Sequence, residues 1–242
     1  MYRGHRVILI PPAYNETGKI GRAVTAVPRD VVDEVLVVDD GSTDGTAEEA
    51  REAGARVISH GRRRGVGACI RTGIDHARRN SFDIIAVMAG NNKDRPEELP
   101  RLLDPIVEGR ADYVQGSRYL PGGEHGTMPL HRRFGTRLYP LIFFFVLGKR
   151  LTDSTNGFRA YRAALFDDPR INLWQDWLDG YELEYYLHYK VLALGYRYHE
   201  EPVTKLYSSA GSSYRTYTKA RPVLDWWRML RPVIYLRLGL KR

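Results

Sequence analysis

The chain has 242 residues, of which 43% are hydrophobic, and this is enough for one large α/β domain with a full core. Its formal net charge of +8 predicts an anionic partner, which would be a nucleic acid, a phosphorylated small molecule or an anionic membrane surface. Cys69 is the only cysteine, which excludes an intramolecular disulfide and a cysteine-based zinc site and favours a buried structural thiol in a reducing compartment.

The N-terminus carries no pattern of a signal peptide. A short basic stretch leads directly into the apolar residues 7–10, a run too short for the hydrophobic region of such a peptide. The longest apolar run, residues 141–147, is far shorter than the roughly 20 residues that a membrane-spanning helix needs. We therefore expect a cytoplasmic protein without a membrane-spanning segment.

Strands and helices are predicted to alternate over residues 7–115. The apolar, β-branched runs 7–10 and 34–38 end in turn residues, as strands buried on both faces do, and residues 19–27 between them have helical spacing. Further strands are expected at 56–59, 83–88 and 112–115, and further helices after Thr43 and at 66–79 and 97–108. This pattern predicts a mostly parallel sheet flanked by helices, with ligands bound at the C-terminal ends of the strands.

The regular alternation ends after Gly116. A loop rich in glycine and proline covers residues 120–129, an aromatic helix is expected at 138–147, and the pattern is mixed up to residue 203. The tail, residues 221–242, interleaves tryptophans and aliphatic residues with basic residues. We expect one α/β domain over residues 1–215 and a C-terminal amphipathic helical segment over 216–242.

Polar clusters follow the first two predicted strands. Residues 12–16 (PAYNE) follow the first, and residues 39–44 (DDGSTD) follow the second. An aspartate at the end of a buried strand can accept hydrogen bonds from a base or a ribose hydroxyl, whereas Asp44 can cap the next helix. We favour the ligand for Asp39 and the cap for Asp44.

Five motifs occur in a fixed order along the chain: PAYNE, VVDDGSTDGT, RRRGVGACIRTGIDHA, GSRYLPGG and DSTNGFRAYR. On these motifs the sequence resembles family 2 glycosyltransferases over residues 5–215, in particular the dolichol-phosphate mannose synthases and related polyprenyl-phosphate sugar synthases. The resemblance implies a GT-A (Rossmann-like) fold. It also implies an inverting transfer of a sugar from a nucleotide-sugar donor to a polyprenyl (dolichyl-type) phosphate acceptor.

The resemblance also implies roles for individual residues. Arg118 faces the phosphate side of the site, and Asp153 lies nearest the acceptor nucleophile, unless it caps a turn. Arg132 and Arg133 meet the acceptor phosphate, unless they form an exposed basic face, and Glu182 lies near the sugar or the base. The residues implied to bind the donor are Pro12, Tyr14, Glu16, Asp39, Gly67, Ala89 and Asn91.

One departure from the family pattern concerns the metal. The resemblance implies an Asp-x-Asp motif holding Mg²⁺ or Mn²⁺ after the strand 83–88, but residues 89–91 are Ala-Gly-Asn. Hard divalent cations prefer charged oxygen ligands. Three alternatives stay open: Asn91 and Asp94 hold a weaker metal with the donor diphosphate, Lys93 and nearby arginines neutralise the leaving group without metal, or the activity is lost.

The lipid acceptors of the family give a reason for the aromatic segment 139–146 and the tryptophan-arginine tail, because amphipathic segments of this kind lie at membrane interfaces. The protein would then be peripheral on the inner face of the membrane. The same patterns are typical of a core helix or of the interface of a homo-oligomer. Two other functions remain: transfer to a soluble hydroxyl acceptor, and a pseudoenzyme that binds nucleotide sugars. No recognition module for nucleic acid is present, so we expect none as a partner.

Overall fold

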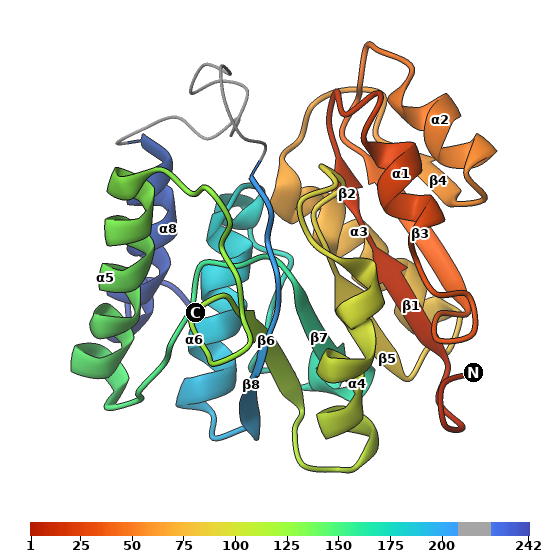
Figure 1. The fold of residues 1–242 in the computed structure, drawn as a ribbon. Helices are drawn as coiled ribbons and strands as arrows, with labels where there is room; N and C mark the ends of the chain where they lie inside the picture. The colour runs from red at the N-terminus through yellow and green to blue at the C-terminus, as the bar shows by residue number, and fades with distance from the viewer. Residues whose placement is uncertain (208–223) are drawn as a thin grey trace.

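A computed structural model describes residues 1–207 and 224–242, apart from the side chains of His131 and Leu224. The boundary that we expect after residue 215 lies outside these residues. The described part is built on an eight-stranded sheet (Figure 1) in the order β2-β3-β1-β5-β7-β6-β8, with β4 paired to β3. The strands are β1 (Val7–Ile10), β2 (Pro12–Ala13), β3 (Glu34–Asp39), β4 (Arg56–Ser59), β5 (Ile84–Val87), β6 (Tyr113–Ser117), β7 (Arg159–Arg162) and β8 (Tyr198–Pro202).

The sheet is mostly parallel, as expected. Strand β1 pairs in parallel with β3 and β5, β3 with β4, and β6 with β8. Strand β7 is antiparallel to both of its neighbours, β5 and β6. Because β7 separates β5 from β6 with two antiparallel pairings, β5 and β6 run in the same direction, and their C-terminal ends lie at the same edge of the sheet.

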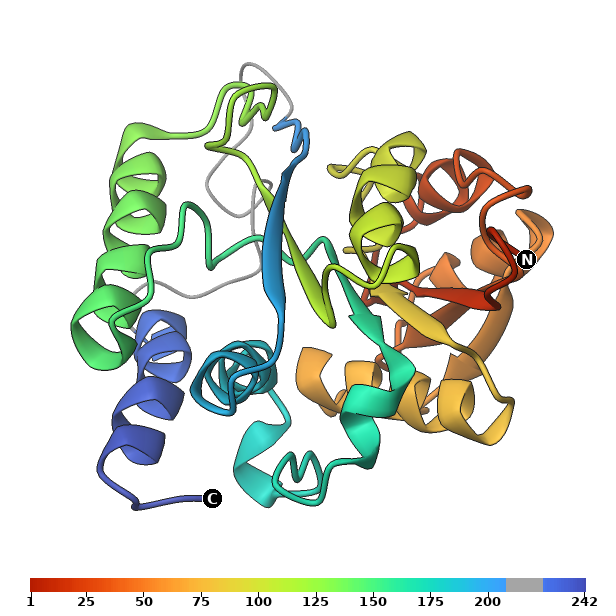
Figure 2. The ribbon, with the colours of Figure 1, turned by 90° about the horizontal axis from the view of Figure 1, so that it is seen from below.

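Helices cover both faces of the sheet (Figure 2). On one face Val7 and Leu9 pack with α1 and α4, and on the other Ile8 and Ile10 pack with α3 and α6. All four residues of β1 are fully buried, which is why its sequence is a continuous apolar run. The helices are α1 (Ile20–Thr25), α2 (Thr46–Glu52), α3 (Val66–Arg79), α4 (Leu99–Val107), α5 (Leu130–Leu147), α6 (Glu182–Ala193) and α8 (Leu224–Arg237), with 3₁₀ turns at Pro96–Glu98, Ala163–Asp167 and Asp176–Leu178.

Helices α5 and α8 pack on α6 beside the β8 edge of the sheet (Figures 1 and 2). An aromatic cluster that includes Tyr139, Phe143 and Tyr185 joins them. Helix α8 confirms the expected C-terminal helix, whereas α5 begins eight residues before the expected start at residue 138. No helix within residues 1–207 and 224–242 has the length and apolar character to cross a bilayer.

Candidate active site

The loops that follow β1, β3 and β5 meet at one edge of the sheet. The Asp40 N–H donates to the Ala13 carbonyl (2.8 Å), and the Gly90 N–H donates to the Pro12 carbonyl (3.2 Å). Strand β1 lies between β3 and β5. The chain therefore runs from β1 to β3 and β4 on one side and then crosses back to β5 on the other side of β1. This reversal is where open α/β sheets bind ligands, and it places the predicted donor-binding residues of all three loops together.

Asp39 ends β3 at this edge. It is only 2% exposed, its Oδ1 accepts the Ser42 N–H (3.1 Å), and its Oδ2 accepts the Ser59 hydroxyl (2.7 Å). A carboxylate offers about four lone-pair positions. Asp39 can therefore accept hydrogen bonds from a ligand while these two bonds hold its orientation.

Tyr14 and Glu16 lie in the loop after β2. The Arg63 guanidinium stacks over the Tyr14 ring at 4.6 Å, which joins this loop to the basic turn of residues 62–64 before α3. Glu16 is buried and accepts a bond from Lys19 Nζ (2.9 Å). The arginine turn is thus packed against an aromatic ring of the predicted donor site.

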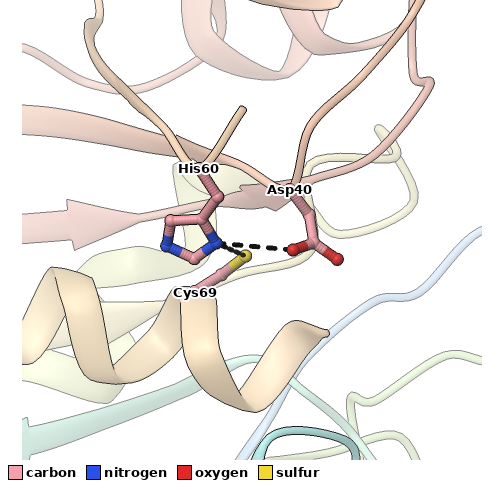
Figure 3. A group of neighbouring side chains, drawn as sticks. All are labelled: Asp40, His60 and Cys69. Carbon is pink, nitrogen blue, oxygen red and sulfur yellow. Dashed lines mark hydrogen bonds and ion pairs between the residues drawn. The ribbon is translucent and has the colours of Figure 1, made fainter. Parts of the chain in front are cut away.

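Asp40 accepts hydrogen bonds from the backbone at the end of the same basic turn and lies next to His60 and Cys69 (Figure 3). Its carboxylate accepts the backbone N–H groups of Arg64 (2.7 Å) and Gly65 (2.9 Å), and His60 Nδ1 lies 3.4 Å from Asp40 Oδ1 and 3.8 Å from Cys69 Sγ. Burial, with the charge of Asp40, raises the pKa of the Cys69 thiol far above its usual value. A protonated, buried thiol is a poor metal ligand, so we interpret this group as structural.

Gly65 and Gly67 bring the start of α3 onto residues 178–180. A Cβ on Gly67 would overlap the carbonyl oxygen of Leu178 and lie 2.5 Å from that of Gly180. Gly65 has φ +113°, and its missing Cβ faces the Asp179 carbonyl. The close approach at Gly67, a predicted donor-binding residue, is therefore to the protein backbone.

The loop after β5 carries the residues expected to hold a metal. Ala89 has no ligand atom in its side chain, and Asp94 is 4% exposed with both oxygens bonded to Lys205 Nζ (2.6 and 2.8 Å). Asn91 Oδ1 is buried and has no hydrogen-bond partner among the described residues. One neutral oxygen beside a carboxylate already paired with lysine does not fit a divalent cation.

Positive charge gathers next to this loop, around the buried ring of Tyr207. Lys93 Nζ lies 5.3 Å and Arg132 Cζ 5.4 Å from the ring centroid, and Arg118 Nη1 donates to the Tyr207 hydroxyl (3.0 Å). Burial, and then the charges of Arg132 and Lys205, lower the pKa of Lys93 to about 8. The surroundings of Lys93 therefore favour an anion.

Arg118 and Asp153 form a buried ion pair beyond the end of β6. Arg118 Nε and Nη2 donate to the two oxygens of Asp153 (2.7 and 2.9 Å), and Nη2 also donates to Thr155 Oγ1 (2.6 Å). Burial raises the pKa of Asp153, but the charge and hydrogen bonds of Arg118 outweigh it and hold the pKa below its ordinary value. Asp153 is fully buried, so it orients Arg118 and has no exposed oxygen with which to receive a proton from an acceptor.

An open pocket of about 400 Å³ lies beside Arg118, lined also by Tyr119, Glu124 and Arg137. Arg137 is exposed on α5 and stacks over the Tyr119 ring at 5.0 Å. Neither Arg132 nor Arg133, the arginines predicted to meet the acceptor phosphate, is among the lining residues.

Arg137 and Lys205 were missed by sequence reasoning. Arg137 follows Arg133 at the helical spacing of four residues. This spacing could have indicated Arg137 if the predicted helix had been extended back to residue 130. Lys205 had no such signal, because its partner Asp94 lies 111 residues away.

Glu182, implied by the resemblance to lie near the sugar or the base, is ion-paired in the structure with the C-terminal helix. Its Oε1 accepts a bond from Arg231 Nη2 (2.5 Å) and lies 3.6 Å from Arg228 Nε. Glu182 is 1% exposed. It therefore anchors α8 to α6.

Residues 8–168 match the model of the family described as "Glycosyl transferase family 2". The chain is 35% identical over 220 residues to an undecaprenyl-phosphate mannosyltransferase of Micrococcus luteus, covering 86% of each chain. It is 33% identical over 209 residues to a polyprenol monophosphomannose synthase of Mycolicibacterium smegmatis, covering 82% of this chain and 77% of that one. Among solved structures, a glucosyl-3-phosphoglycerate synthase from Mycobacterium tuberculosis in complex with Mn²⁺, UDP and phosphoglyceric acid has the same fold, with a TM-score of 0.69 at 21% identity over 99% of this chain and 80% of that one.

Proposed function

The chain belongs to glycosyl transferase family 2, and we propose that it transfers a sugar with inversion from a nucleotide-sugar donor to the phosphate of a polyprenyl phosphate. The relatives named for transfer to undecaprenyl phosphate and for polyprenol monophosphomannose synthesis support this acceptor. The observation that carries it is that the pocket of Arg118 and Arg137 adjoins an exposed apolar face of α5.

That apolar face, called here the α5 stripe, is a row of exposed residues three or four positions apart on one side of the helix. Phe134 is 72% and Phe145 is 81% exposed. Arg137 lies in the same helix and lines the pocket. The stripe consists of Leu130, Phe134, Leu138, Leu141 and Phe145.

A polyprenyl phosphate combines an anionic head with a long apolar tail, and this arrangement can accept both. The arginines of the pocket would bind the phosphate, and the α5 stripe would lie at the lipid interface. A net charge of +8 favours an anionic bilayer surface. We accordingly propose a peripheral protein on the inner face of the membrane.

The proposed transfer does not need a general base for the acceptor. A phosphate oxygen of the acceptor is already anionic, so it can attack the anomeric carbon without a general base. The bond from that carbon to the donor diphosphate breaks as the new bond forms, which inverts the configuration. Four of the five guanidinium N–H groups of Arg118 donate to Asp153, Tyr207 and Thr155, and the fifth would bind the acceptor phosphate together with the exposed Arg137. Asp39 would accept hydrogen bonds from hydroxyl or N–H groups of the nucleoside.

Membrane binding through the α5 stripe can be tested on Phe145. The substitution Phe145→Asp is expected to weaken binding to vesicles containing phosphatidylglycerol by about tenfold or more, because burial of a phenylalanine contributes about 1.5–3 kcal/mol. Co-sedimentation with the vesicles measures the effect. The control Trp174→Ser changes an exposed aromatic residue between β7 and α6 and should bind the vesicles as the wild type does. If Phe145→Asp also binds like the wild type, membrane binding through the α5 stripe is contradicted.

The acceptor is tested by the release of nucleoside diphosphate from a panel of UDP-, GDP- and dTDP-sugars in detergent. Undecaprenyl phosphate should accelerate release from one donor, whereas undecaprenol without the phosphate should not. Acceleration by soluble alcohols instead would favour the alternative of a soluble acceptor. Nucleotide binding without release under any condition would favour the pseudoenzyme.

A further inference from the structure

The edge of the sheet sets the order in which parts of a donor and an acceptor can lie. Asp39 ends β3, Lys93 follows β5, and Arg118 follows β6, while the sheet order runs from β3 through β1 and β5 to β6. These three strands run in the same direction, so the three residues lie along one edge. With the nucleoside at Asp39 and the acceptor phosphate at Arg118, the donor diphosphate must pass the loop that carries Lys93.

Three acids of this region each have a cationic partner. Asp94 is paired with Lys205 and Asp153 with Arg118. Glu16, which also acts on Lys93 electrostatically, accepts a bond from Lys19. Lys93 and Arg132 both lie over the ring of Tyr207, so two positive charges lie close together beside the loop after β5.

We propose that Lys93 and Arg132 bind the donor diphosphate in place of a divalent metal, so that donor binding and transfer need no metal ion. The inference rests on the proposed function. As the bond from the anomeric carbon breaks, its electron pair goes to the diphosphate oxygen, which gains one negative charge. A fixed ammonium and a fixed guanidinium beside that oxygen stabilise the developing charge, and no carboxylate is needed to hold an ion there.

Asn91 contributes an acceptor to the same arrangement. Its Oδ1 is buried without a hydrogen-bond partner among the described residues, and a buried unsatisfied oxygen is costly. A hydroxyl of the donor's ribose or sugar can donate to it. This gives the amide a role that a metal-binding carboxylate could not fill without changing the local charge.

The test is calorimetric titration of the intact protein with UDP, with GDP and with dTDP, in EDTA and in Mn²⁺. The wild type should bind one of them with the same affinity in both buffers. Lys93→Met should weaken this binding by about tenfold or more, since hydrogen bonds to charged groups contribute about 1.5–3 kcal/mol, and Arg132→Met should weaken it in the same direction. Lys93→Arg, which keeps the charge, should retain most of the affinity.

Lys149→Met, at an exposed lysine after α5, is the matched control and should bind as the wild type does. Thermal melting shows whether each variant folds. If wild-type binding is lost in EDTA and restored by Mn²⁺, or if both methionine variants at positions 93 and 132 bind like the wild type, the metal-free proposal is overturned while the proposed function stands. If none of the three nucleotides binds in either buffer, the proposed function fails and this inference fails with it.

Discussion

Replacing Arg118 by methionine is expected to abolish sugar transfer and to lower the free energy of unfolding by about 3–5 kcal/mol. Arg118 is 2% exposed and Asp153 is fully buried, so the substitution leaves a buried carboxylate without its counter-ion. It also removes the donors to Thr155 and to the Tyr207 hydroxyl. Urea denaturation measures the loss of stability, and nucleoside diphosphate release measures the loss of transfer.

The matched control is Arg137→Met. Arg137 lines the same pocket but is exposed, so this variant should lose acceptor-dependent release while its unfolding midpoint stays that of the wild type. If the Arg118→Met protein is as stable as the wild type, Arg118 does not stabilise a buried carboxylate at Asp153.

The same pair predicts a dependence of stability on pH. The folded pKa of Asp153 lies below its ordinary value of 3.8, so the unfolded chain takes up the proton first as the pH falls. The contribution of the pair to stability is therefore complete above the ordinary pKa and is lost as the pH drops through the folded pKa. Arg118→Met should reduce this acid-dependent loss of stability.

Replacing Gly67 by alanine is expected to lower the free energy of unfolding by about 1–3 kcal/mol or more, because overpacking against rigid backbone forces the chain to shift. The new Cβ would overlap the Leu178 carbonyl oxygen and crowd that of Gly180. The start of α3 would move away from residues 178–180, whose Asp179 carbonyl accepts the Ala68 N–H (3.1 Å). Urea denaturation measures the effect.

Gly157→Ala serves as the comparison. Its new Cβ would meet only Glu184 Oε1, at the ordinary contact distance of 3.4 Å. This variant should unfold within about 1 kcal/mol of the wild type, in the range typical of tolerated substitutions. A Gly67→Ala protein that is equally stable would mean that α3 does not approach residues 178–180 this closely.

The first half of the fold could be predicted because its strands β1, β3 and β5 are buried on both faces. Continuous apolar runs such as residues 7–10 leave little choice of structure, and the alternation with helical spacing indicated the parallel sheet. Strands β7 and β8 carry polar sequences, Arg-Ala-Tyr-Arg and Tyr-His-Glu-Glu-Pro, which gave no such signal. Arg159 is nevertheless buried in β7, because its guanidinium donates to the carbonyls of Asn156 (2.7 Å) and Glu184 (3.1 Å).

The donor-binding aspartate of the candidate site could be predicted from the sequence, whereas its buried ion pairs could not. Asp39 could be chosen from its place at the end of a buried strand, since that place is a local property of the sequence. The pairing of Asp94 with Lys205 and of Asp153 with Arg118 joins residues 111 and 35 positions apart. Such pairs depend on tertiary packing, so the sequence alone left Asp94 as a candidate metal ligand and Asp153 as the residue nearest the acceptor nucleophile.

The most direct measurement of the proposed reaction is the structure of its product. The wild-type protein would be incubated with undecaprenyl phosphate and with the donor that supports release, and the lipid fraction would be analysed by mass spectrometry and NMR. The account predicts one hexose joined through its anomeric carbon to the lipid phosphate, in the configuration opposite to that of the donor. Consumption of donor with no sugar in the lipid fraction, or a product that retains the donor's configuration, would contradict it.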